Sequence, residues 1–135
     1  NNELHVTSTH YDDQIALDLV RGSQRTVAIH GCEGNESVAY IGGSDDRLIE
    51  LITESLEDIG ISVREAPHHI SGTQENNIVN MTQTQGGVQL ELTAQLRKEL
   101  FKNRKSSRKN RENKDNWDDL MYDFADAMKK AIERA

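Results

Sequence analysis

The spacing of apolar residues along the chain alternates between the two-residue period of strands and the three- to four-residue period of helices. Runs of alternating or β-branched apolar residues predict strands, and segments with apolar residues every three or four positions predict helices. The predicted strands are residues 4–9, 26–30, 37–41, 61–65 and 88–93. The predicted helices are residues 12–21, 45–59, 94–101 and from 115 or 116 to about 134. This alternation indicates an α/β fold with a mixed, mostly parallel open sheet and helices on both of its faces.

Capping residues support the ends of these predicted helices. Asp12 or Asp13 can cap the first helix, and Ser44 is a good N-cap for the second, which Gly60 closes. The last helix carries an apolar stripe at three- and four-residue steps, so we expect it to pack on the body of the protein. That stripe consists of Trp117, Leu120, Met121, Phe124, Met128 and Ile132.

Two segments have no regular period. Residues 67–85 are rich in His, Asn, Thr and Gln, and irregular segments of that length in compact domains are often functional. Residues 103–114 carry six Lys and Arg side chains without an apolar stripe, which predicts a flexible, solvated basic segment between two helices.

Composition narrows the classes of function. The chain has 135 residues, the size of one ordinary domain, and its net charge of −7 disfavours a surface built to hold nucleic acid. No apolar run approaches the roughly 20 residues of a membrane span. The chain has one cysteine, Cys32, so it cannot form an internal disulfide. The chain begins Asn1-Asn2-Glu3 rather than with Met, so we interpret it as a fragment or a processed chain whose targeting signals are not readable.

Two polar residues interrupt apolar strand patterns. His30 ends the run TVAIH and is followed by Gly31; this position suits a ligand or catalytic group as well as a hydrogen-bonded core histidine. Glu91 lies with Gln89 on the face of strand 88–93 opposite its apolar residues. One interpretation is an edge strand with this face exposed to solvent. The other is that Glu91 points into a polar cleft, where desolvation would raise its pKa toward that of a general base.

Other polar residues carry weaker signals. Asn77 and Asn80, in the long polar segment, suit turns or hydrogen bonds to a substrate. The neighbouring histidines at 68 and 69 favour no metal site, and His5 and His10 have no regular spacing to His30. Cys32 follows His30 closely, but no orienting partner for a thiol nucleophile is evident, and small buried cysteines are common.

Five motifs, in order and at similar spacing, resemble the phage-type poly-γ-glutamate hydrolases, a family also called phage-related replication proteins. The resemblance covers residues 3 to about 101 and rests on ELHVTSTHYDD, VAIHGC, YIGGSDDRL, NNIVN and GGVQLELTAQLRKELF. It implies a fold similar to the zinc carboxypeptidases and cleavage of γ-amide bonds in polyglutamate. It also implies a phage or prophage protein, a monomer that is cytoplasmic or released on host lysis.

The resemblance also implies roles for individual residues. His30 matches the zinc-binding histidine of the family's His-Gly-Cys motif, and Glu91 matches the glutamate placed as general base. Asn77 and Asn80 match an Asn-Ile-x-Asn motif that would hold the substrate carboxylate or the oxyanion. Zinc would be the cofactor, with three protein ligands and a water.

The chain departs from the family pattern in two ways. The family's other two zinc ligands belong to a His-Gly-Gly motif that is absent here, so we expect the chain to lack the family's N-terminal part and half of the metal site. Basic residues expected just after Asn80 are replaced by residues such as Met81. Arg47, Arg97 or the basic segment would then have to bind a polyanionic substrate.

A non-catalytic protein is the alternative hypothesis. In it, residues 103–114 would bind nucleic acid or another polyanion, and binding would weaken steeply with salt.

Overall fold

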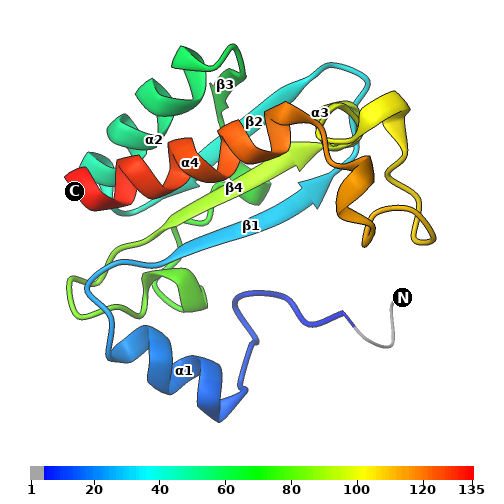
Figure 1. The fold of residues 1–135 in the computed structure, drawn as a ribbon. Coiled ribbons are helices and arrows are strands. Elements are labelled where there is room, and N and C mark those ends of the chain that lie inside the picture. Colours follow the sequence, from blue (N-terminus) through cyan, green and yellow to red (C-terminus); the bar gives the residue numbers. More distant parts are fainter. Residues whose placement is uncertain (1–4) are drawn as a thin grey trace.

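Four strands form a single open sheet in the computed structural model, which describes residues 5–135. The strands are β1 (Val27–Cys32), β2 (Val38–Gly43), β3 (Ser62–Glu65) and β4 (Val88–Thr93). They lie in the order β1-β4-β2-β3, with β1–β4 and β2–β3 parallel and β2–β4 antiparallel (Figure 1). The predicted α/β class with a mixed, mostly parallel open sheet is confirmed.

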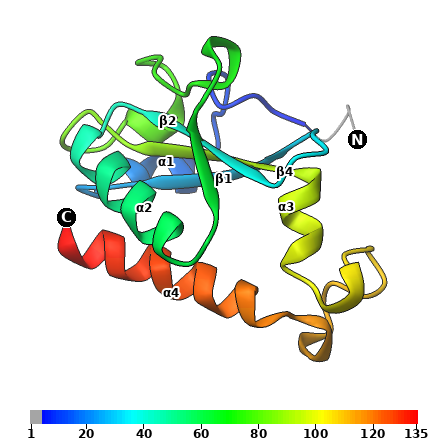
Figure 2. The same ribbon diagram turned by 90° about the horizontal axis from the view of Figure 1, so that it is seen from above.

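Helices and irregular chain cover the two faces of this sheet. The helices are α1 (Gln14–Arg21), α2 (Asp46–Asp58), α3 (Ala94–Glu99) and α4 (Asp119–Arg134). Helices α2 and α4 lie on one face (Figure 2). Residues 67–87 lie over the other and contain the 3₁₀ turns η2 (His68–Ile70) and η3 (Ile78–Asn80), of which η3 contacts α1. In the described part of the chain, no helix combines the length and the apolar character needed to cross a membrane.

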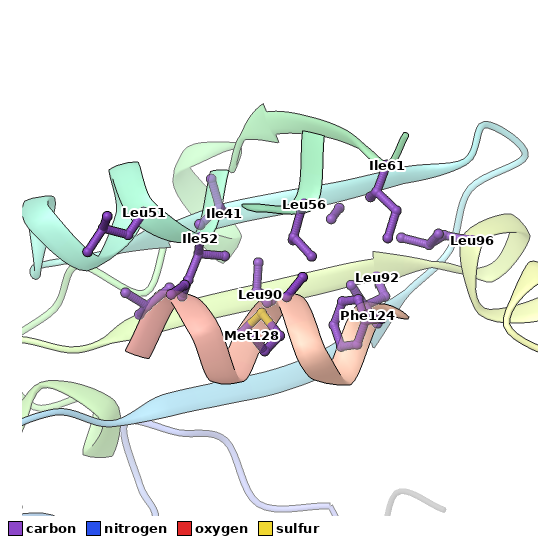
Figure 3. Packing of buried hydrophobic residues seen from close by; sticks show 14 of the residues in the cluster. Ile41, Leu51, Ile52, Leu56, Ile61, Leu90, Leu92, Leu96, Phe124 and Met128 are labelled. Atoms are coloured by element: carbon purple, nitrogen blue, oxygen red, sulfur yellow. The ribbon is translucent and has the colours of Figure 1, made fainter. Parts of the chain in front are cut away.

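The hydrophobic core lies between the sheet and the pair α2–α4 (Figure 3). Strand β4 directs Leu90 and Leu92 into it, where they meet Phe124 and Met128 of α4. Leu90 is fully buried, so its side chain contributes its whole transfer free energy to folding. The expected docking of the last helix on the body is confirmed.

Glycine lets the irregular segment lie directly on the sheet. A Cβ atom at Gly42 would lie 2.0 Å from the carbonyl oxygen of Ser71, and one at Gly87 would lie 2.0 Å from that of Val79. Neither position has room for a side chain. The segment therefore lies in backbone contact with Gly42 of β2 and folds back on Gly87, the residue just before β4.

Two helices begin later than the sequence predicts. Asp45, not Ser44, caps α2, because the backbone N–H groups of Ser44 and Asp45 both donate to the carbonyl of Gly87 and hold Ser44 outside the helix. Helix α4 is capped by Asp118, whose backbone N–H donates to the carbonyl of Leu100. Trp117, just before this cap, is extended and pairs with Phe101 as an isolated bridge, and the 3₁₀ turn η5 (Lys114–Asn116) precedes it.

The predicted strand at residues 4–9 does not form in the described residues, and Leu4 lies outside them. Residues 7–10 make a turn, closed by a hydrogen bond from His10 to Thr7. The carbonyl of Ser8 accepts from the backbone N–H of Ile78. Ser8 is therefore hydrogen-bonded to the irregular segment, and residues 5–9 do not join the sheet.

The basic segment is exposed, as predicted, but it is built from turns. The side chain of Asn116 donates to the carbonyl of Asn110, and the indole of Trp117 donates to that of Arg111. The ammonium of Lys114 lies 5.8 Å from the centre of the Trp117 ring. These contacts hold the segment to the start of the last helix.

Shortening a core leucine tests this arrangement. We expect Leu90→Ala to lower the free energy of unfolding by about 2–5 kcal/mol, through lost burial and the cavity left behind. The matched control is Leu19→Ala in α1, because Leu19 is 68% exposed. The control should change stability by about 0.5 kcal/mol or less. Urea unfolding followed by circular dichroism measures both, and equal losses would contradict the assignment of the core.

Candidate functional site

The pairing of β1 with β4 brings His30 and Glu91 together. They are direct partners in the parallel register, on the sheet face opposite the core. Strand β1 runs to Cys32, so His30 lies inside the strand and not at its end. The two residues singled out from sequence are thus neighbours on one face.

Glu91 is a buried carboxylate, only 8% exposed. Burial raises its pKa above the usual range, while the charge of His30 and a hydrogen bond from Gln89 act in the opposite direction. The amide nitrogen of Gln89 lies 3.4 Å from the Glu91 oxygen Oε1. Burial is the largest of the three effects, so the environment favours a carboxyl group that can take up a proton.

A chain of side-chain amides leads to Glu91 from the irregular segment. The Nδ2 of Asn77 donates to the Oε1 of Gln89 at 3.1 Å, and Gln89 also donates to the carbonyl of Ile70 at 3.3 Å. All three polar side chains are buried. Gln89 was indicated by sequence only as a neighbour of Glu91 on one face; its role in orienting that carboxylate was missed.

The imidazole of His30 has an unused nitrogen. Its Nε2 is buried and has no hydrogen-bond partner among the described residues, which is rare for a buried polar atom and suits a metal ligand. However, within residues 5–135 no three His, Cys, Asp or Glu side chains are grouped so that they could hold a metal ion. The described residues therefore fit one ligand of a zinc site and do not fit a complete site.

His30 and Glu91 open into a cleft of about 720 Å³. Its walls come from residues 5–11, from η2 and the chain after it, and from β1 and β4. All five histidines of the chain line this cleft: His5, His10, His30, His68 and His69. Sequence spacing did not show this gathering, because the histidines belong to segments far apart in the chain.

The other predicted site residues are placed differently. Asn77 lines the cleft, whereas Asn80 is buried in the irregular segment. The side chain of Asn80 donates to the carbonyls of Gly72 and Gln74 and accepts from the N–H of Gly87, so its polar atoms are used to hold the segment together.

The structure does not bring Arg47 to the cleft. It is exposed on α2 and lies 3.7 Å from Glu50. Arg97 donates to the backbone carbonyls of Leu92 and Cys32, so it too is engaged elsewhere.

Cys32 is poorly suited to be a nucleophile. Burial raises the pKa of its thiol, and the charge of Glu91 raises it further. The reactive thiolate is therefore disfavoured, in agreement with the prediction from sequence.

The fold and the site place this chain in the class of α/β proteins with a polar cleft on the sheet face opposite the core. Histidines and a buried glutamate line that cleft. The profile of the poly-gamma-glutamate hydrolase family matches residues 1–127, and the chain belongs to that family. Its fold is similar to the structure of a bacteriophage poly-gamma-glutamate hydrolase, with a TM-score of 0.91, 32% identity, and coverage of 99% of this chain and 64% of the other. The zinc-free apo form of YndL has a TM-score of 0.86 at 27% identity, covering 96% and 63%.

Two curated relatives come from Bacillus subtilis strain 168. The UPF0714 protein YmaC is 31% identical, over 99% of this chain and 56% of its own length. The SPbeta prophage-derived UPF0714 protein YoqZ is 36% identical, over 74% of this chain and 37% of its own length. The chain thus spans little more than half the length of these relatives, or less.

The buried carboxyl of Glu91 predicts a pH-dependent stability. Its pKa is raised on folding, so its contribution is most favourable at acidic pH and is lost as pH rises through the folded-state value. We therefore expect the stability of Glu91→Gln, measured relative to that of the unsubstituted protein, to increase as the pH is raised from about 4 to about 8.

Urea unfolding at several pH values measures this difference. Glu57→Gln, at an exposed position on α2, is the matched control, and its difference should stay nearly constant. A difference for Glu91→Gln that does not change with pH would contradict the burial of an ionisable group.

Proposed function

We propose that this chain is the C-terminal portion of a zinc-dependent hydrolase that cleaves the γ-glutamyl amide bonds of poly-γ-glutamate, and that residues 1–135 form a single α/β domain of it. The observation that carries the proposal is the pairing of a buried glutamate with an unpartnered histidine nitrogen in one cleft. Membership of the family and the likeness to the bacteriophage hydrolase support it.

Glu91 is the general base in this proposal. Amide hydrolysis requires a group that takes a proton from the attacking water and returns it to the leaving amine. A carboxylate whose pKa is raised by burial is a better proton acceptor than an exposed one. Gln89 fixes its orientation by donating to one oxygen, which leaves the other oxygen for the water.

His30 supplies one protein ligand of the zinc ion through Nε2. When bound, zinc lowers the pKa of a water molecule and polarises the scissile carbonyl. Since the described residues hold no group of three ligands, the proposal requires further ligands outside them. The Nε2 of His30 has no hydrogen-bond partner among residues 5–135, so none of their hydrogen bonds would have to break for it to bind a metal.

Asn77 is the substrate-binding amide. Its oxygen accepts from the N–H of Val79 and one of its amide hydrogens goes to Gln89, so a second hydrogen is available at the cleft. We assign that hydrogen to the oxyanion or the substrate carboxylate. Asn80 acts on this group indirectly, by fixing the irregular segment that carries it.

Replacing the base tests the catalytic role. We expect Glu91→Gln to lower the rate of hydrolysis of γ-linked polyglutamate by about 100-fold or more in the intact protein, because the amide cannot take up the proton. Zinc content should be unchanged. Rates are followed by release of shorter chains on size-exclusion chromatography. Full activity in this variant would exclude Glu91 as the base.

Replacing the histidine tests the metal role separately. We expect His30→Ala to lower the zinc content of the intact protein, measured by mass spectrometry of the metal after dialysis. His69→Ala, which removes another imidazole of the same cleft, is the matched control and should keep its zinc. Unchanged metal stoichiometry in His30→Ala would show that this side chain is a core histidine.

A further inference from the structure

Within residues 5–135, no Lys or Arg side chain lines the cleft that holds Glu91. Its titratable lining residues are the five histidines, Tyr11 and Glu91. Every residue of a γ-linked polyglutamate chain keeps a free α-carboxylate, so such a substrate brings a row of negative charges. It would enter a protein of net charge −7, next to a buried glutamate. Binding therefore needs positive charge at the cleft.

The guanidinium groups of Arg64 in β3 and Arg97 in α3 are engaged elsewhere. Arg64 lies 2.6 Å from Glu36 in an ion pair, and Arg97 is bonded to two backbone carbonyls at the end of the sheet. Neither residue lines the cleft. The imidazoles are the groups among its described lining residues that can carry a positive charge.

Two of these imidazoles stand on a firmly held turn. His68 and His69 are exposed on η2, directly after Pro67. The hydroxyl of Ser71 donates to the carbonyl of His68 at 3.0 Å, and Gln89 of β4 donates to that of Ile70. The same glutamine orients Glu91, so this turn and the proposed base have a fixed relation to each other.

We propose that His68 and His69, together with His5 and His10 on the facing segment, bind the α-carboxylates of the γ-linked glutamate chain as imidazolium ions. The inference rests on the proposed function only in taking polyglutamate as the ligand of this cleft. His30 is left out because its nitrogen is assigned to the metal. Substrate binding then strengthens at acidic pH and weakens as the imidazoles lose their protons.

A binding experiment tests this without relying on turnover. The chain is titrated with a γ-linked glutamate decamer by calorimetry, with a chelator present and at constant ionic strength. We expect the affinity to fall about tenfold or more between about pH 5.5 and pH 8. His68→Asn combined with His69→Asn should lose about fivefold or more at the acidic pH and little at the basic one.

A charge-restoring variant separates cationic binding from a structural role. With His68→Lys and His69→Lys together, the decamer should bind at about pH 8 about fivefold or more tightly than it binds the unsubstituted chain at that pH, since lysine stays charged. Lys105→Gln with Lys109→Gln removes two charges from the basic segment and should leave the affinity unchanged.

The outcomes also separate this inference from the proposed function. Affinity that does not depend on pH, or that the asparagine variant keeps, overturns the histidine inference even if hydrolysis by Glu91 is observed. No binding at either pH overturns it as well. Binding with the expected pH dependence but without hydrolysis in the intact protein leaves the inference standing and overturns the proposed activity.

Discussion

Strand β4 has both of its faces buried, and the two layers of the structure are built against it. One face directs leucine and valine side chains into the core beneath α2 and α4. The other face buries Gln89 and Glu91, whose desolvation opposes folding unless partners are present. Those partners are His30 on β1 and the amides of the irregular segment. A single strand therefore couples the stability of the core to the geometry of the cleft.

The irregular segment between β3 and β4 is the second half of this arrangement. It contacts the sheet through glycine backbones, and Asn80 joins its two ends by hydrogen bonds to Gly72 and Gly87. It carries Asn77 and η2 to the polar face of the sheet. Binding residues are often carried on loops that a rigid scaffold holds in place, and the hydrogen bonds of Asn77 and Asn80 hold this segment against the sheet.

The local sequence pattern was sufficient to predict most strands of the sheet and to single out His30 and Glu91. Strand 88–93 was predicted with its correct bounds and faces because alternation over six residues records which side is apolar. The strand expected at residues 4–9 failed because residues 7–10 form a turn and Ser8 is hydrogen-bonded to Ile78, a partner that local pattern does not reveal. Ser44 failed as a cap because Gly87, more than forty residues away, holds its backbone.

The same limit applies to the site. The family resemblance was confirmed, and it pointed to residues whose motifs are contiguous in sequence. The five histidines were not connected, because three separate segments bring them to one cleft. Arg47 was proposed on charge alone, and charge without position does not show which face of the molecule a side chain reaches.

The central claim is that this cleft, and not the basic segment, receives the polyglutamate chain. The most direct measurement is the change in backbone amide chemical shifts when a γ-linked glutamate oligomer is added to the ¹⁵N-labelled chain in the presence of a chelator. The account predicts that the largest changes fall on residues 68–72, on Asn77 and on residues 89–91, which line the cleft or adjoin its lining. Changes confined to residues 103–114 would contradict it.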